Sequence, residues 1–241
     1  MTETENTAIV LHYTNYKDSD RMITLFSPQK GRLEANCRGC RKPKSPLLNA
    51  AELFALGDFM LYEKSGRYTV TSVSLIETFY PLRMDFDRLT CATYLLSLCD
   101  AVVQPGEPAR DLFMLLLHTL SRLTYSDQEW RPLLSGFLLH FAALNGFRPR
   151  LLHCIRCGDR LTGDTNAFFD LHGGMCCPAC RMNGDQAVSA AQQKFMRMAY
   201  ETGASKWVNT PDCHAPFGLL RRYVETQMGQ RIHGSRMLPD D

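Results

Sequence analysis

The chain has 241 residues, of which 45% are hydrophobic and 22% charged, and its formal net charge is +2. This composition is typical of a globular protein, and no apolar run reaches the roughly 18 residues that a membrane span needs. The first ten residues are acidic and polar, so we expect no export and no membrane partner, and we place the protein in the cytoplasm.

The first third of the chain has the pattern of a β domain. Five short segments are rich in β-branched and aromatic residues and are separated by turn residues such as Pro28, Gly31 and Gly66. We expect strands at 7–13, 21–27, 32–37, 52–63 and 67–77. Five short strands without an intervening long helix predict a β-barrel of the OB type, and we assign it to residues 1–80.

The period of the apolar residues becomes helical from Phe86 onward. Ser189 and Gln192 form a capping-box pattern at the start of one of these segments. The expected helices are 86–103, 109–125, 129–147, 189–203 and 215–232. We therefore predict an α+β protein whose helical domain has a first part at 81–149 and a second part at 189–241.

The segment between the two helical parts, residues 150–188, contains two Cys-x-x-Cys pairs. Cys154 and Cys157 form the first, Cys177 and Cys180 the second, with 19 residues between the pairs. This spacing is typical of a tetrahedral zinc site, in which each tight turn supplies two thiolates. Four protein ligands leave no open coordination position, so we predict one structural Zn²⁺ that folds this segment.

Other uses of these cysteines are open from the sequence. The thiols could be buried or could form disulfides, and His153 or His172 could replace one ligand. Cys176 lies beside the second pair, but pairing it with Cys180 would leave three residues between them. We therefore treat Cys176 as the spare cysteine.

The remaining cysteines show no metal-site spacing. Cys37 and Cys40 form a lone Cys-x-x-Cys, for which a redox pair or half a metal site are alternatives. Strand alternation would place them on opposite sides, so we interpret them as ordinary thiols. Cys91 and Cys99 lie on the apolar side of a predicted helix and are expected in the core, and Cys213 has no nearby partner.

Basic residues are clustered although the net charge is small. Residues 30–44 include six basic residues and only one acidic residue, Glu34. These candidate nucleic-acid contacts are Lys30, Arg32, Arg38, Arg41, Lys42 and Lys44. A second basic excess contains Lys194, Arg197, Lys206, Arg221, Arg222, Arg231 and Arg236. Clusters of this kind favour polyanion binding, because cations on an exposed loop neutralise phosphates.

The sequence contains no phosphate-binding glycine loop, no nucleophile elbow and no zinc-protease motif, so we do not expect an enzyme. Three carboxylates, Asp18, Asp20 and Asp85, keep a metal-dependent nuclease as one alternative, although such residues more often cap helices and turns. A second alternative is an RNA-binding factor that combines a zinc ribbon with an OB barrel.

A basic small barrel followed by a helical domain with a four-cysteine module resembles the bacterial RecO family of recombination mediators. At the N-terminus, "AIVLHYTNYKDSDRMITLFSPQKGRLEANCRGCRKPKS" is similar to the family's opening strands and to its G-x-R-x-x-K-S loop. That loop is formed here by Gly39, Arg41, Lys44 and Ser45. "RYVETQMGQRIHGSRML" (222–238) resembles the family's last helix and S-x-x-L tail. Cys40 departs from the small residue that is usual in the loop.

The resemblance implies a non-enzymatic DNA repair mediator. Such a protein binds single- and double-stranded DNA, anneals complementary strands, and works with RecR to load RecA onto DNA covered by SSB. It implies Arg38, Arg41 and Lys44 as phosphate contacts, with Lys42 added by its position. Because the zinc module occurs in only some family members, the resemblance also implies a scaffolding role for it.

Overall fold

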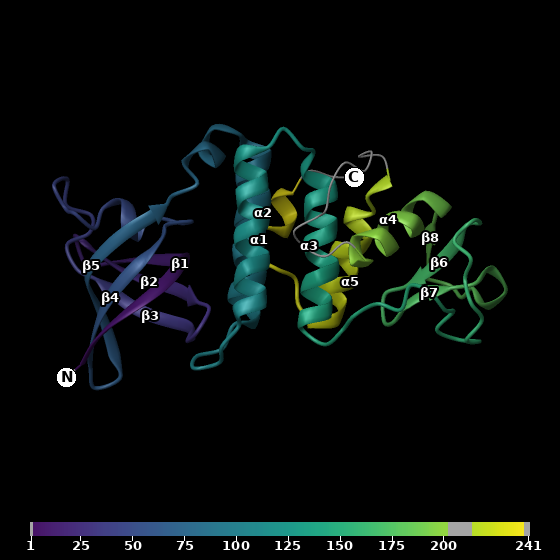
Figure 1. The fold of residues 1–241 in the computed structure, drawn as a ribbon, viewed down its shortest axis with the longest axis horizontal. Coiled ribbons are helices and arrows are strands. Elements are labelled where there is room, and N and C mark those ends of the chain that lie inside the picture. The colour runs from purple at the N-terminus through teal and green to yellow at the C-terminus, as the bar shows by residue number, and fades with distance from the viewer. Residues whose placement is uncertain (1, 202–213, 239–241) are drawn as a thin grey trace. The chain divides into compact units, whose positions relative to one another are not determined.

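The computed structural model describes residues 2–201 and 214–238 (Figure 1). The chain divides into two compact units, residues 1–116 and 117–241, and the boundary falls inside helix α2. The strands of the first unit are β1 (Thr2–Tyr16), β2 (Asp20–Ser27), β3 (Gly31–Cys37), β4 (Leu56–Lys64) and β5 (Arg67–Glu77). The other elements are α1 (Phe86–Val102), α2 (Arg110–Tyr125), α3 (Trp130–Leu144), β6 (Ala167–Asp170), β7 (Gly174–Cys176), β8 (Gln186–Val188), α4 (Ala190–Glu201) and α5 (Phe217–Met228).

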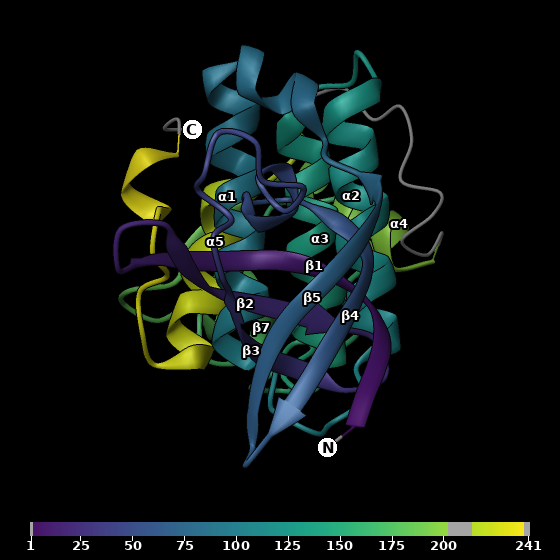
Figure 2. The same ribbon diagram turned by 90° about the vertical axis from the view of Figure 1, so that its left-hand side faces the viewer.

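The five N-terminal strands form a closed barrel in the order β1-β2-β3-β5-β4, seen face-on in Figure 2. Strand β1 is long enough to close it, because its first half pairs with β4 and its second half with β2. An irregularity between Val10 and His12 divides the two halves, and such bulges bend a strand. Alternating apolar residues, among them Ile23, Leu25 and Phe59, fill the interior.

The turn between β2 and β3 is joined to the segment between α1 and α2. The Arg32 N–H donates to the Gln104 carbonyl at 3.1 Å, and the Gly106 N–H donates to the Lys30 carbonyl at 2.9 Å. Gly31, at φ +64°, is required here because a Cβ atom would collide with the Gln104 carbonyl oxygen.

Helix α1 contains two of the remaining cysteines. Cys91 and Cys99 are both fully buried, as their positions on the apolar side of the helix predict.

The second unit contains α3, α4, α5 and a three-stranded sheet in the order β7-β6-β8. The sheet packs on α5 through an edge-to-face contact of Phe169 with Tyr223, whose ring centroids lie 5.4 Å apart. Tyr223 also donates its hydroxyl to the Phe147 carbonyl at 2.7 Å. The cysteine-rich segment is therefore packed against the helices of its unit.

The predicted α+β class, with an OB-type barrel followed by helices, is confirmed. The capping box is present, because Ser189 and Gln192 exchange hydrogen bonds of 3.0 and 3.2 Å between side chain and main chain. Two predictions need correction. Strand β1 extends beyond 7–13 in both directions, and β4 begins at Leu56 and not at residue 52, because residues 52–55 form a turn in which the Ala55 N–H donates to the Glu52 carbonyl at 3.2 Å. Cys213 and Lys206 lie outside the described residues.

None of the helices in the described part of the chain is both long and apolar enough to cross a membrane.

Candidate metal centre and nucleic-acid interface

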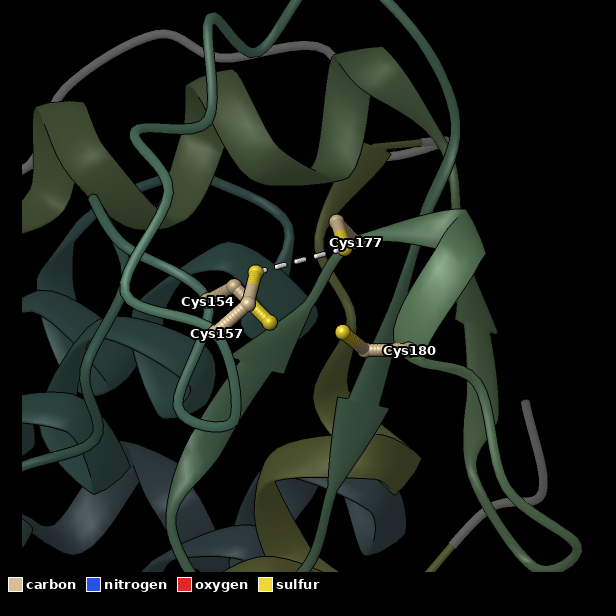
Figure 3. Close-up of side chains that lie close together, drawn as sticks. All are labelled: Cys154, Cys157, Cys177 and Cys180. Atoms are coloured by element: carbon tan, nitrogen blue, oxygen red, sulfur yellow. Dashed lines mark hydrogen bonds between the residues drawn. The ribbon is translucent and has the colours of Figure 1, made fainter.

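Four cysteine side chains converge in the second unit, as Figure 3 shows. The sulfur atoms of Cys154, Cys157, Cys177 and Cys180 all lie within 4.8 Å of one another. The Cys157 and Cys177 sulfurs are 3.7 Å apart, and four sulfurs bound to one zinc ion at ~2.3 Å would be separated by about 3.8 Å. The arrangement therefore fits a tetrahedral metal ion.

Main-chain hydrogen bonds build the two cysteine turns and place them side by side. In the first turn the Gly158 N–H donates to the Cys154 carbonyl at 3.0 Å, and Gly158 takes φ +83°. In the second turn the Cys180 N–H donates to the Cys177 carbonyl at 3.1 Å. The Ile155 N–H donates to the Met175 carbonyl at 2.9 Å, which joins the first turn to the strand that leads into the second.

Arg156 connects the two turns through its guanidinium group. It donates to the Cys180 carbonyl at 2.7 Å, to Asp185 at 2.6 and 2.9 Å, and to Asp170 at 2.8 Å. These bonds hold the pKa of Asp185 below its usual range. The sequence analysis did not identify this role. The signal was an arginine between the cysteines of the first pair, with one aspartate before and one after the second pair.

The thiol groups differ in how easily they ionise. Burial opposes ionisation of Cys154, but N–H groups of Cys157, Cys177 and Arg156 donate to its sulfur and lower its pKa to about 6. For Cys157 an N–H of Asp159 favours the thiolate, but hydrogen bonds with neighbouring thiols and desolvation raise the pKa to about 12. A metal ion must therefore displace protons from the cluster, and its affinity should rise with pH.

The alternative ligands do not join the cluster. Cys176 is fully buried, and burial raises its pKa to about 11, so its thiol stays protonated. Among the described residues only the four cysteines form a metal-competent group, and neither His153 nor His172 belongs to it. Spacing alone thus identified the four converging thiols.

The loop that follows β3 is basic and exposed. Arg38, Arg41, Lys42 and Lys44 are all exposed in residues 38–46. Within residues 2–201 and 214–238, Arg38, Lys42 and Lys44 form no ion pair with an acidic side chain. These charges remain available for an anion.

The turn between β1 and β2 supports this loop. The Arg41 N–H donates to the Ser19 carbonyl at 3.0 Å, and its guanidinium donates to the Asp18 carbonyl at 3.2 Å. The Asp20 carboxylate accepts from the Gly39 N–H at 2.8 Å, where Gly39 takes φ +64°. The Arg41 guanidinium also lies 3.5 Å from the Lys17 carbonyl, so exposed Lys17 is next to the same loop, although the sequence pattern did not indicate it.

Lys30 and Arg32 lie at the opposite end of β3 from this loop. Arg32 forms ion pairs with Asp100 and Glu34, and Lys30 donates to Thr4 Oγ1 at 3.4 Å. The seven residues of β3 separate the two groups by about 20 Å. Four of the six predicted contact residues thus lie in one loop, whereas Arg32 is ion-paired with Asp100.

Two of the three candidate catalytic carboxylates have structural partners. Asp20 anchors Gly39, and Asp85 caps α1 by accepting from the Arg88 N–H at 3.0 Å. The main-chain carbonyl of Asp18 accepts from Arg41. Among the described residues, no group of three or more potential metal ligands includes a carboxylate.

The prediction that Cys37 and Cys40 point to opposite sides is wrong. Both side chains are buried in the barrel core, because β3 ends at Cys37 and strand alternation does not continue to Cys40. Burial, with the adjacent Cys40 thiol, raises the pKa of Cys37 above its ordinary value. The two cysteines are therefore core thiols.

Comparison with known protein families shows to which family the chain belongs. A family described as "Recombination protein O N terminal" matches residues 1–79, and one described as "Recombination protein O C terminal" matches residues 83–236. The chain belongs to the RecO family. The two matches span the barrel strands and the helices together with the four cysteines.

Curated relatives agree with this assignment. A DNA repair protein RecO from Acetivibrio thermocellus is 31% identical over 196 residues, which cover 81% of this chain and 78% of the relative. The RecO protein of Alkaliphilus metalliredigens is 33% identical over 171 residues, covering 71% and 69%. That of Desulforamulus reducens is 28% identical over 231 residues, covering 93% and 90%. The chain is thus a RecO-family DNA repair protein.

Proposed function

We propose that this RecO-family chain is a non-enzymatic mediator that binds single- and double-stranded DNA and anneals complementary strands. The observation that carries the proposal is the exposed group of cations on a closed OB-type barrel, in a chain of this family. The contacts we propose are Arg38, Arg41, Lys42 and Lys44, extended by Lys17. Lys30 lies at the other end of β3 from these residues, and the Arg32 guanidinium is ion-paired with Asp100.

Electrostatics explains how such a surface anneals DNA. Two complementary strands repel each other through their phosphates, and each cation that replaces condensed counterions reduces this repulsion. Cations on a loop fixed to a rigid barrel hold a strand without covering the base edges that must pair. No bond is made or broken, so the activity needs no catalytic side chain.

We propose that Zn²⁺ is the ion held by Cys154, Cys157, Cys177 and Cys180. Four thiolates favour zinc over hard cations, which prefer oxygen ligands, and the 3.7 Å between the Cys157 and Cys177 sulfurs fits two ligands of one zinc ion. When bound, the ion cross-links two turns and stabilises residues 150–188. The chain's own residues complete the scaffold, with Arg156 joining the two turns.

Family membership supports the finer assignments. We propose that residues 1–80 form the DNA-binding domain, with the zinc module at 150–188 inserted between helical parts at 81–149 and 189–241. We further propose RecR and SSB as protein partners and RecA as the protein that is finally loaded. The site of action would be the cytoplasm, at the nucleoid during repair.

The salt dependence of DNA binding tests the proposed surface. Changing Lys42→Ala together with Lys44→Ala should weaken binding of a single-stranded oligonucleotide and lower the slope of log K against log salt by about 1 to 2. Fluorescence anisotropy at several salt concentrations measures both quantities. The charge-retaining pair Lys42→Arg with Lys44→Arg should restore the slope. An unchanged affinity and slope in the alanine pair would exclude this loop as the DNA surface.

An annealing assay tests the activity itself. Two complementary fluorescent oligonucleotides coated with SSB should anneal faster with the purified chain, with or without magnesium. Tighter binding to structured RNA, with no acceleration of annealing, would instead favour the RNA-binding alternative. Cleavage that depends on Mg²⁺ and is lost in Asp20→Asn would favour the nuclease.

A further inference from the structure

An exposed aromatic ring lies at the edge of the basic loop. Tyr16 is the last residue of β1 and is 45% exposed. It pairs with Asp20, the residue whose carboxylate anchors the loop through Gly39. Tyr13, three residues earlier, is by contrast covered by the Arg21 guanidinium at 3.9 Å from its ring centroid. The ring of Tyr16 is therefore partly presented to solvent, at the end of a paired strand.

Two cations, Lys17 and Arg41, lie beside Tyr16 or the residues that follow it. The Lys17 ammonium lies 5.2 Å from the Tyr16 ring centroid. Arg41 connects the next residues to the loop, because its N–H and guanidinium bond the carbonyls of Ser19 and Asp18. Within the described residues this Lys17 contact is the one ring interaction recorded for Tyr16. The ring thus contributes to a charged surface and not to the core.

We propose that the Tyr16 ring stacks on an unpaired base of a DNA strand whose phosphates lie along residues 38–44. The inference rests on the proposed DNA-binding function and adds a base contact to its phosphate contacts. An aromatic ring beside a row of cations is the combination that single-strand-binding surfaces use, since every base offers a π face.

The same geometry gives a preference for single strands. In a duplex the faces of each base are covered by its neighbours in the stack, so a side chain of the barrel meets only edges and phosphates. A stacking ring therefore adds affinity for an unpaired strand and none for a duplex. Lys17, which contacts the ring face in the free protein, can move to a phosphate when a base takes that face.

Substitution at Tyr16 tests the proposal. Tyr16→Ala should weaken binding of an oligothymidine strand roughly fivefold or more and leave binding of a duplex of equal length unchanged. Its salt slope should equal that of the unaltered protein, because no phosphate contact is removed. Tyr16→Phe should recover the affinity that alanine loses. Tyr80→Ala is the matched control, because Tyr80 is also exposed, at 63%, and also lies near a guanidinium, that of Arg83 at 5.9 Å.

A strand of the same length with abasic sites separates stacking from other contacts. The unaltered protein and Tyr16→Ala should bind this strand equally. Equal affinity of the two proteins for oligothymidine would overturn the inference, as would an equal loss for strand and duplex. A loss in Tyr16→Phe as large as in Tyr16→Ala would assign the contact to the hydroxyl and overturn stacking. If the unaltered protein binds no DNA, the proposed function fails as well, and the two failures are thereby distinguished.

Discussion

Cys176 and Cys177 are neighbours in the chain, but only one of them faces the other thiols. Strand β7 ends at Cys176, whose side chain points into the core and is fully buried. The chain then turns through Pro178, and this turn directs Cys177 toward Cys157. Two adjacent residues of one type therefore differ in chemistry because a strand ends between them.

Replacing each of these cysteines tests the ligand set. Cys177→Ser should release the metal, because three thiolates and a hydroxyl hold zinc far more weakly, and it should destabilise the second unit. Cys176→Ala should keep about one zinc per chain and lose little stability, since it removes only one buried sulfur. Metal analysis of the purified proteins and thermal unfolding measure both effects. Equal zinc loss from the two variants would contradict the assignment.

At the scale of elements, the features that depend on local sequence patterns were predicted correctly, whereas those that depend on long-range contacts were not. The Cys-x-x-Cys spacing and the capping box act within a few residues, so both could be read directly. The short strands β6, β7 and β8 have three or four residues each, too few to show alternation. Their positions depend on the cysteine turns and on α5.

The extent of the basic surface also depended on distant pairing. Lys17 joins the loop only because Arg21 of β2 pairs with Cys37 of β3, which brings the β1–β2 turn beside residues 38–46. In the same way, Arg32 differs from Lys42 because Asp100 of α1 lies next to it. Counting charges along the sequence cannot reveal the position of Lys17 or the partner of Arg32, since both depend on strand register and helix packing.

The Asp20 carboxylate is one of the contacts that hold the loop on the barrel, and it provides a prediction for this element. Asp20→Ala should leave the Gly39 N–H without its partner and destabilise the first unit by about 1 kcal/mol. It should also weaken single-strand binding, because the cations are then held less firmly. Asp20→Asn keeps an oxygen acceptor and should behave nearly as the unaltered chain. Urea unfolding and anisotropy measure the two effects, and a larger loss in Asp20→Asn than in Asp20→Ala would contradict this role.

For the whole molecule, the four-cysteine cluster and the proposed DNA surface belong to different units of the chain. The contacts that hold the basic loop come from residues 17–20, within the first unit, while the four thiols and Arg156 belong to the second. The zinc module should therefore contribute to stability and leave phosphate contacts unchanged. This division agrees with a scaffolding role for the module.

Removal of the metal tests this division. Treatment of the full chain with a chelator should lower its thermal stability, because residues 150–188 lose the ion that joins their turns. Below the new unfolding temperature, affinity for a short single strand should change by no more than about twofold, with the same salt slope, since the contacts that hold the basic loop come from residues 17–20 of the first unit. Calorimetry and anisotropy on one sample, before and after zinc is restored, make the comparison. A lower salt slope in the metal-free chain would show that the second unit supplies phosphate contacts, and the DNA surface would then extend beyond the barrel.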